Sequence, residues 1–224
     1  YSDRPIPFTE TELGEVKTIS APHMIITLLH NMELLEEQEV IIIGSKGGYL
    51  AALVAQLIGE KGIVRVLDTC SNVISHSKQR LTHWPTIEFR ELESIEVSPV
   101  AFPGEFDRVL ITGHIEELPN WITSRISDTG FVIAPLGPDN NQHLMKIEKQ
   151  GDELFPTNLG PVCFGPLENK KQNGQYISPL ELAELLELVI QTCQELDIIE
   201  EEEINQLQDI IAELYFLPDD LPPV

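Results

Sequence analysis

Three glycines and a distant aspartate have the types and spacing of a cofactor site. Gly44, Gly47 and Gly48 follow the β-branched run Val40–Ile43, and Asp68 ends the next such run, "IVRVLD". Glycines after a strand let the backbone approach a ligand closely, and an acidic residue ending the second strand can hold two ribose hydroxyls. The pattern predicts a site for an adenosine-containing cofactor. The alternative is that the glycines only permit a tight turn and that Asp68 is a solvated strand end.

Strands and helices that alternate along the chain would place these residues at one edge of a sheet. Strands are predicted at 40–43, 63–68, 86–92, 106–113 and 130–137, and helices at 21–35, 49–58, 73–81 and 119–126. Such alternation is typical of an α/β fold with a doubly wound, mostly parallel sheet. We expect the first 17 residues, which contain Pro5 and Pro7, to form an extended N-terminal segment.

The composition is that of a soluble globular protein with an acidic surface. The 224 residues are 42% hydrophobic and 23% charged, and the net charge is −23. No apolar run approaches the ~18 residues that span a bilayer, so no membrane segment is predicted. An acidic surface repels phosphate backbones, which argues against a nucleic acid partner.

Cysteines and histidines are scattered. Cys70, Cys163 and Cys193 lie far apart, which indicates reduced thiols and a cytoplasmic location rather than a disulfide framework or a zinc site. The histidines show no ligand spacing, so no metal site is predicted. We expect His114, which follows the fourth strand, to lie in a surface loop.

The C-terminal part has a different composition. After Lys171 the chain has no lysine or arginine, while acidic residues continue and include the run Glu200–Glu203. We predict a domain at 1–167, a linker at 168–177 and an acidic helical hairpin at 178–224. Its first helix would begin with a capping box at Ser178 and carry one apolar face, formed by Leu182, Leu185, Leu186, Val189, Ile190 and Cys193. This face would pack on the chain's own domain, or serve self-association or docking of a partner protein.

Several motifs resemble the protein-L-isoaspartate O-methyltransferase family. The specific one is "TISAPHM", Thr18–Met24, and the opening "YSDRPIPF" and the turn "IGSKGGYLAAL" support it. Similarity continues through "FDRVLITG" and "VCFGPL", so it covers roughly residues 1–167. Because the chain begins inside the family pattern, we expect the family's N-terminal helical segment to be missing.

The resemblance implies a Rossmann-like methyltransferase that uses S-adenosylmethionine and methylates isoaspartyl carboxylates of damaged proteins. It implies two sets of site residues. The cofactor side would comprise Gly44, Lys46, Gly48, Tyr49, Asp68 and Glu93. The substrate side would comprise Thr18, Ser20 and His23, with Ser20 as the hydrogen-bond partner of the isoaspartyl carboxylate.

Two positions in the turn depart from the family pattern. Ile42 stands where the family has an acidic residue, and Lys46 stands where it has the middle glycine. A lysine here places a positive charge near a sulfonium and an ammonium, which is unfavourable, or it reaches the cofactor carboxylate, or it points to solvent. Two functions therefore stay open: a divergent methyltransferase, or a binding or scaffold subunit that has lost the cofactor and acts through its acidic tail. A nucleic-acid methyltransferase is disfavoured by the net charge.

Overall fold

The computed structural model describes residues 3–10, 16–99, 104–167, 179–195 and 200–216. The chain divides into two compact units, Tyr1–Asn169 and Lys170–Val224. The predicted linker at 168–177 and Ser178 of the predicted capping box lie outside the described residues. In the described part of the chain, no helix is both long and apolar enough to cross a membrane.

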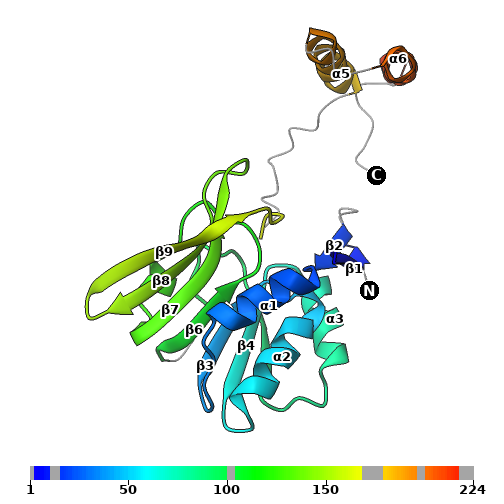
Figure 1. Cartoon of the computed structure of the whole chain (residues 1–224). Coiled ribbons are helices and arrows are strands. Elements are labelled where there is room, and N and C mark those ends of the chain that lie inside the picture. Colours follow the sequence, from blue (N-terminus) through cyan, green and yellow to red (C-terminus); the bar gives the residue numbers. More distant parts are fainter. Residues whose placement is uncertain (1–2, 11–15, 100–103, 168–178, 196–199, 217–224) are drawn as a thin grey trace. The chain divides into compact units, whose positions relative to one another are not determined.

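Unit 1 is built on a sheet whose described strands have the order β5-β4-β3-β6-β7-β8-β9 (Figure 1). The parallel strands are β3 (Glu39–Ile43), β4 (Ile63–Asp68), β5 (Ile87–Glu91), β6 (Phe106–Ile111) and β7 (Ile126–Leu136). The chain runs outward from β3 to β5, then returns to β6 on the other side of β3. This reversal is the point where doubly wound sheets bind ligands. The predicted mostly parallel α/β fold is confirmed.

Two antiparallel strands extend the sheet beyond β7 and were not predicted from the sequence. β8 (Gln142–Gln150) pairs with β7, and β9 (Glu153–Val162) pairs with β8 and forms the edge. Most residues of β9 are exposed, so it lacks the apolar run of a buried strand. The helix predicted at 119–126 is reduced to α4 (Asn120–Thr123), because β7 already begins at Ile126.

Helices cover one face of the sheet, and loop residues with the short α4 cover the other. α1 (Pro22–Asn31) and α2 (Tyr49–Ile58) pack on one face, where Leu28 and Val54 share a cluster with Ile42 of β3 (Figure 1). α3 (Ser71–Arg80) follows β4. The opposite face has its own cluster, which contains Ile41 and Ile122. The helix predicted at 21–35 was too long: α1 ends at Asn31, and Leu35 is 65% exposed.

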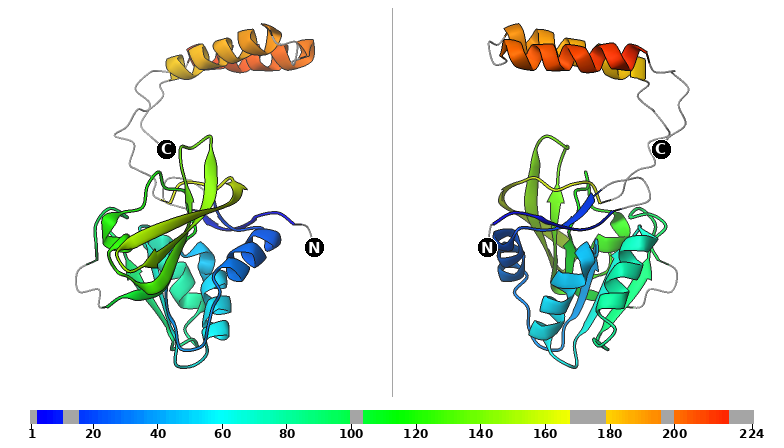
Figure 2. Two further views of the ribbon diagram at one scale, coloured as in Figure 1. Left: turned by 60° about the vertical axis from the view of Figure 1, so that its left-hand side comes forward. Right: turned by 90° about the vertical axis from the view of Figure 1, so that its right-hand side faces the viewer.

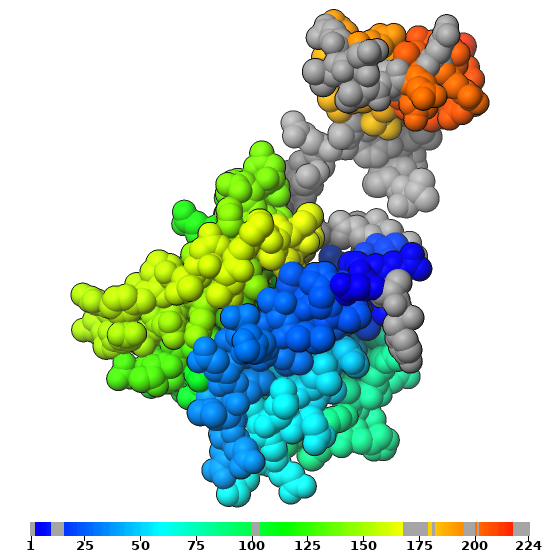
Figure 3. Space-filling model, viewed as in Figure 1, coloured from blue at the N-terminus to red at the C-terminus, as the bar shows by residue number. Residues whose placement is uncertain are grey.

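The N-terminal segment forms a two-stranded antiparallel hairpin of β1 (Ile6–Glu10) and β2 (Val16–Ile19). Figure 3 shows it on the surface beside α1. Asp3 ties this segment to the helix, because one carboxylate oxygen accepts the His23 N–H at 3.0 Å and the other lies 2.8 Å from His23 Nδ1. The backbone hydrogen bond, followed by the side-chain one, lowers the pKa of Asp3. The carboxylate satisfies an N–H of the first helical turn that has no partner within the helix.

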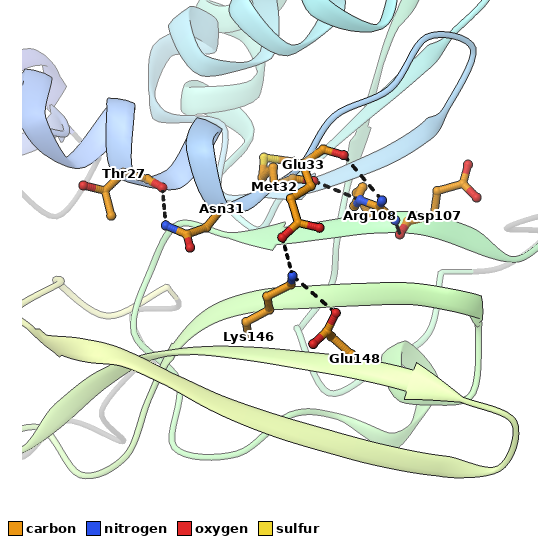
Figure 4. A network of polar contacts seen from close by, with 8 residues as sticks. All are labelled: Thr27, Asn31, Met32, Glu33, Asp107, Arg108, Lys146 and Glu148. Carbon is orange, nitrogen blue, oxygen red and sulfur yellow. Dashed lines mark hydrogen bonds and ion pairs between the residues drawn. The ribbon is translucent and has the colours of Figure 1, made fainter.

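A pair of buried cations attaches the end of α1 to the sheet (Figure 4). Arg108 of β6 donates from Nε to the Met32 carbonyl at 2.9 Å and from Nη2 to the Glu33 carbonyl at 3.4 Å. Lys146 of β8 donates to the Glu33 carboxylate at 2.8 Å. The two cationic groups lie 4.1 and 4.2 Å from the ring centroid of Phe131. Arg108 therefore satisfies carbonyls at the C-terminal end of α1, where helices leave carbonyls without partners.

Unit 2 is a pair of helices, α5 (Pro179–Glu195) and α6 (Glu201–Tyr215), which run side by side (Figure 2). Ala183, Ile190 and Ile211 form its buried core. The single apolar face predicted for the first helix is wrong in part, because Leu182, Leu185 and Val189 are 39–48% exposed while Leu186 and Ile190 pack toward α6. Tyr215 donates its hydroxyl to Glu187 at 3.0 Å, and this hydrogen bond raises the tyrosine pKa.

Candidate functional site

A pocket of about 240 Å³ opens where β3, β4 and β6 end. Its floor contains Gly44, Asp68 and Thr112, which lie at or just past the ends of these three strands. Its lining is completed by Phe8, Val16, Lys17, Thr18, Lys46, Val73, Gly113, Gly165, Pro166 and Leu167. The site lies at the switch in strand order, as the sequence predicted for a ligand site.

The turn after β3 requires glycine at its first position. Gly44 has φ +94°, and a Cβ there would lie 2.3 Å from Thr112 Oγ1. The Thr112 hydroxyl is 2.7 Å from the Gly44 carbonyl and 3.2 Å from the Ile43 carbonyl. Any larger residue at 44 would displace this hydroxyl and fill the floor of the pocket. The shape of the turn thus depends on a residue without a side chain at position 44.

Asp68 holds the turn against the end of β4. Its Oδ2 accepts the backbone N–H of Ser45 at 2.7 Å, and its Oδ1 accepts that of Cys70 at 3.0 Å. The hydroxyls of Ser45 and Ser77 lie 2.9 Å apart beneath the turn. Each carboxylate oxygen has a second lone pair, so the aspartate can position the turn and also accept a hydrogen bond from a ligand.

Lys46 brings a positive charge into the pocket. Its backbone has φ +44°, and its ammonium lies 5.9 Å from the ring centroid of Phe164. Burial lowers the pKa of Lys46, nearby Lys17 lowers it further, and Asp68 acts in the opposite direction. The charged form of this side chain is therefore disfavoured in the protein alone.

The comparison with known families decides between the functions that this geometry could serve. A family model described as protein-L-isoaspartate(D-aspartate) O-methyltransferase matches residues 1–172. The chain belongs to this family.

Individual relatives agree with this placement. A protein-L-isoaspartate O-methyltransferase of Fervidobacterium nodosum is 26% identical over 168 residues, which cover 75% of this chain and 82% of that protein. A solved protein-L-isoaspartate O-methyltransferase superposes with a TM-score of 0.68 at 20% identity, over 83% of this chain and 57% of that one. A beta-aspartate methyltransferase from Plasmodium falciparum, solved in complex with S-adenosyl-L-homocysteine, gives 0.62 at 24% identity, over 75% of this chain and 81% of that one. The two structures show the shared fold.

The pocket has some, but not all, of the features that an adenosyl cofactor of the methyltransferase family requires. The open floor at Gly44 and the carboxylate of Asp68 suit the turn and the ribose. The enclosed volume is below the ~300–1,000 Å³ usual for small-molecule sites. Phe8 and Val16 of the N-terminal hairpin line the pocket, and Phe8 lies 3.1 Å from where a Cβ of Gly47 would stand. A whole cofactor would therefore need these hairpin residues to move outward.

The residues that the family resemblance suggested are not all in the pocket. Thr18, Gly44, Lys46 and Asp68 line it, whereas Ser20, His23, Gly48, Tyr49 and Glu93 do not. Tyr49 is 50% exposed and Glu93 is also exposed. The side chain of His23 pairs with Asp3 and is 60% exposed. The roles suggested for these outer residues stay predictions.

Ile42 does not face the pocket. It is 1% exposed and packs among the residues between the sheet and α1 and α2. The family's acidic residue at this position thus has an apolar replacement inside the core, and the isoleucine contributes to packing.

Some site residues were missed by sequence reasoning. Thr112 could have been found, because it lies at the end of the strand predicted at 106–113 and so shares an edge of the sheet with Gly44. Phe8 could not, because nothing in its pattern indicates that the hairpin covers the turn. His114 was expected on the surface but is 6% exposed, and that expectation is wrong. Its ring lies between the Gly137 carbonyl and the Asp139 carboxylate, and its backbone pairs with Gly165 and Leu167, which line the pocket.

Proposed function

We propose that the chain transfers the methyl group of S-adenosylmethionine to the isoaspartyl carboxylate of a damaged protein. The family match over residues 1–172 carries the proposal. The pocket at the ends of β3, β4 and β6 supports it, since it combines a glycine turn with an acidic strand end. The family match favours this enzyme over a binding or scaffold subunit.

The cofactor side is assigned to the turn and the strand end beside it. Gly44 leaves space at the floor of the pocket, and Asp68 fixes the backbone of Ser45 while its remaining lone pairs accept ribose hydroxyls. Thr112 holds the carbonyl of Gly44 in place. The sulfonium, when bound, supplies an activated methyl group.

The substrate side is assigned to Thr18 and, further along the same segment, Ser20. A substrate carboxyl with a pKa near ~4 is ionised at neutral pH, so no general base is required. The bound cofactor would supply its methyl group to one carboxylate oxygen as the carbon–sulfur bond breaks, with S-adenosylhomocysteine as the leaving group, so the residues of the chain would need to move no proton. The protein's task is to align the reacting atoms and exclude water, and Phe8 and Val16 provide an apolar cover for this.

The test is methyl transfer to a matched pair of peptides, one with isoaspartate and one with aspartate at the same position. With labelled S-adenosylmethionine, we expect saturable labelling of the isoaspartyl peptide only. The Thr18→Val variant, which removes the hydroxyl and keeps the volume, should raise the KM for peptide and leave the Kd for S-adenosylhomocysteine unchanged. Equal labelling of both peptides, or none by a folded chain, would contradict the proposal.

A further inference from the structure

Lys46 is a pocket residue whose chemistry the proposed reaction does not require. It stands where the family pattern has the middle glycine, yet its backbone keeps a positive φ of 44°, a conformation that is unfavourable for a residue with a side chain. A lysine retained in a conformation suited to glycine is not explained by the folding of the turn. Its side chain lies at the lining of the pocket, where it can meet a ligand.

The charges around the pocket favour an anion near Lys46. Among the described residues, the lining carries Lys46 and one carboxylate, that of Asp68. Both oxygens of that carboxylate already accept backbone N–H groups, from Ser45 and Cys70. Among the described residues, no acidic side chain lies within ion-pair distance of Lys46.

The electrostatics of the protein alone point the same way. Burial and the neighbouring Lys17 both lower the pKa of Lys46, so the ammonium is poorly compensated. A ligand anion placed against it would supply the missing compensation. An ammonium or sulfonium at the same place would add to the repulsion.

We propose that Lys46 binds the carboxylate of the cofactor's amino-acid end, so that this chain recognises that end through its anion. The inference rests on the proposed use of S-adenosylmethionine. In the family pattern an acidic residue precedes the turn and the middle position is glycine. Here position 42 is a buried isoleucine that does not face the pocket, and the middle position of the turn is a lysine, which adds a positive charge to the lining.

Three ligands separate the charges involved. S-adenosylhomocysteine has the carboxylate but a neutral thioether, S-adenosylmethionine adds the positive sulfonium, and 5′-methylthioadenosine lacks the amino-acid end altogether. A lysine that binds the carboxylate gains most from the first, less from the second because of the sulfonium, and nothing from the third. The relative loss on removing its charge should follow the same order.

The experiment is calorimetric titration of the full chain and its Lys46→Met variant with each ligand. We expect about a tenfold loss of affinity for S-adenosylhomocysteine, a smaller loss for S-adenosylmethionine and no change for 5′-methylthioadenosine. The Lys46→Arg variant should restore most of the lost affinity. Lys61→Met is the matched control, since it removes the same charge from an exposed lysine that pairs with Glu37. Glu37 precedes β3 and Lys61 precedes β4, so both lie at the ends of these strands opposite the pocket.

The outcomes distinguish this inference from the proposed function. Unchanged affinity of Lys46→Met for S-adenosylhomocysteine, or an equal loss for all three ligands, would overturn the role of Lys46 and leave the enzyme intact. A folded wild-type chain that binds none of the three ligands would overturn the cofactor, and with it both proposals. A loss in the Lys61→Met control equal to that in Lys46→Met would show a general charge effect and would also overturn the inference.

Discussion

Asp68 accepts the backbone N–H of Ser45 at 2.7 Å, and this contact joins the end of β4 to the glycine turn after β3. The same carboxylate accepts the N–H of Cys70 at the start of the next connection. One side chain thus fixes two loops that border the pocket. A substitution that removes this carboxylate should therefore weaken cofactor binding and disturb the shape of the turn at the same time.

Replacing Asp68 with asparagine should weaken the binding of S-adenosylhomocysteine by about tenfold or more and destabilise the fold by about 1–3 kcal/mol, because one N–H then faces an amide NH₂. Calorimetric titration and thermal melting measure the two effects. Glu91→Gln is the matched control, since Glu91 pairs with Asp68 in register at the end of β5 but is exposed. An equal loss in the control would rule out a specific role for Asp68.

Gly44→Ala should destabilise the protein by about 2–4 kcal/mol, because the new Cβ meets Thr112 in addition to adopting a positive φ. Gly59→Ala isolates the second effect, since Gly59 has φ +77° with nothing within 4 Å of its Cβ position. It should cost about 1–3 kcal/mol, because φ +77° with ψ −175° is a conformation that only glycine adopts readily. Chemical denaturation gives both values. Equal losses would mean that the contact with Thr112 is relieved by a small shift.

Arg108→Met should destabilise unit 1 by about 2–4 kcal/mol, because the carbonyls of Met32 and Glu33 lose a donor at the end of α1. Lys146→Met should cost only about 1 kcal/mol, since methionine keeps the contact with Phe131 and the freed Glu33 is largely exposed. Denaturant titration of both variants checks the order. A larger loss for Lys146 would place the main attachment of α1 on β8 instead of β6.

Phe8→Ala should speed the association of S-adenosylhomocysteine, because the hairpin would no longer need to move its ring away from the glycine turn. Stopped-flow fluorescence with Trp84 or Trp121 as reporter measures the rate. Ile6→Ala on the same hairpin is the control, since Ile6 is 55% exposed and does not line the pocket. An unchanged association rate for Phe8→Ala would mean that the cofactor enters without displacement of this ring.

Acid should destabilise the protein partly through Asp3. The pKa of Asp3 in the folded protein lies below its usual value of 3.8, so its stabilising effect is present above that value and is lost as the pH falls through the folded pKa. Asp3→Asn should therefore lose less stability than the wild type between about pH 7 and pH 3. Asp152→Asn, on the exposed β8–β9 turn, should lose as much stability over this pH range as the wild type does. Thermal melts across this range decide, and identical slopes for the Asp3 variant would contradict the prediction.

The parallel half of the fold was predictable because its elements have strong local patterns. The run Val40–Ile43 and the strand ending at Asp68 are largely apolar because both of their faces are buried in hydrophobic clusters. α2 was predicted with its observed bounds. β8 and β9 were not predicted. β8 is half-exposed and contains lysines, and β9 is an exposed edge strand, so neither has the apolar run of a buried strand.

The sequence predicts at which edge of the sheet the site lies. It predicts less well which side chains line the site. Gly44 and Asp68 were placed by strand ends, which are local. The direction of Ile42, the burial of His114 and the cover provided by Phe8 depend on contacts between segments far apart in sequence. Such contacts leave no periodic signal in the chain.

The edge strand β9 carries Pro156 opposite Ile147 and Pro161 opposite His143. Proline has no N–H, so β9 lacks a backbone donor at these two positions. At the other border, β5 carries the charged residues Glu88, Arg90 and Glu91. Both borders thus oppose the addition of a strand from a neighbouring molecule, and the protein should resist amyloid-like stacking even when concentrated.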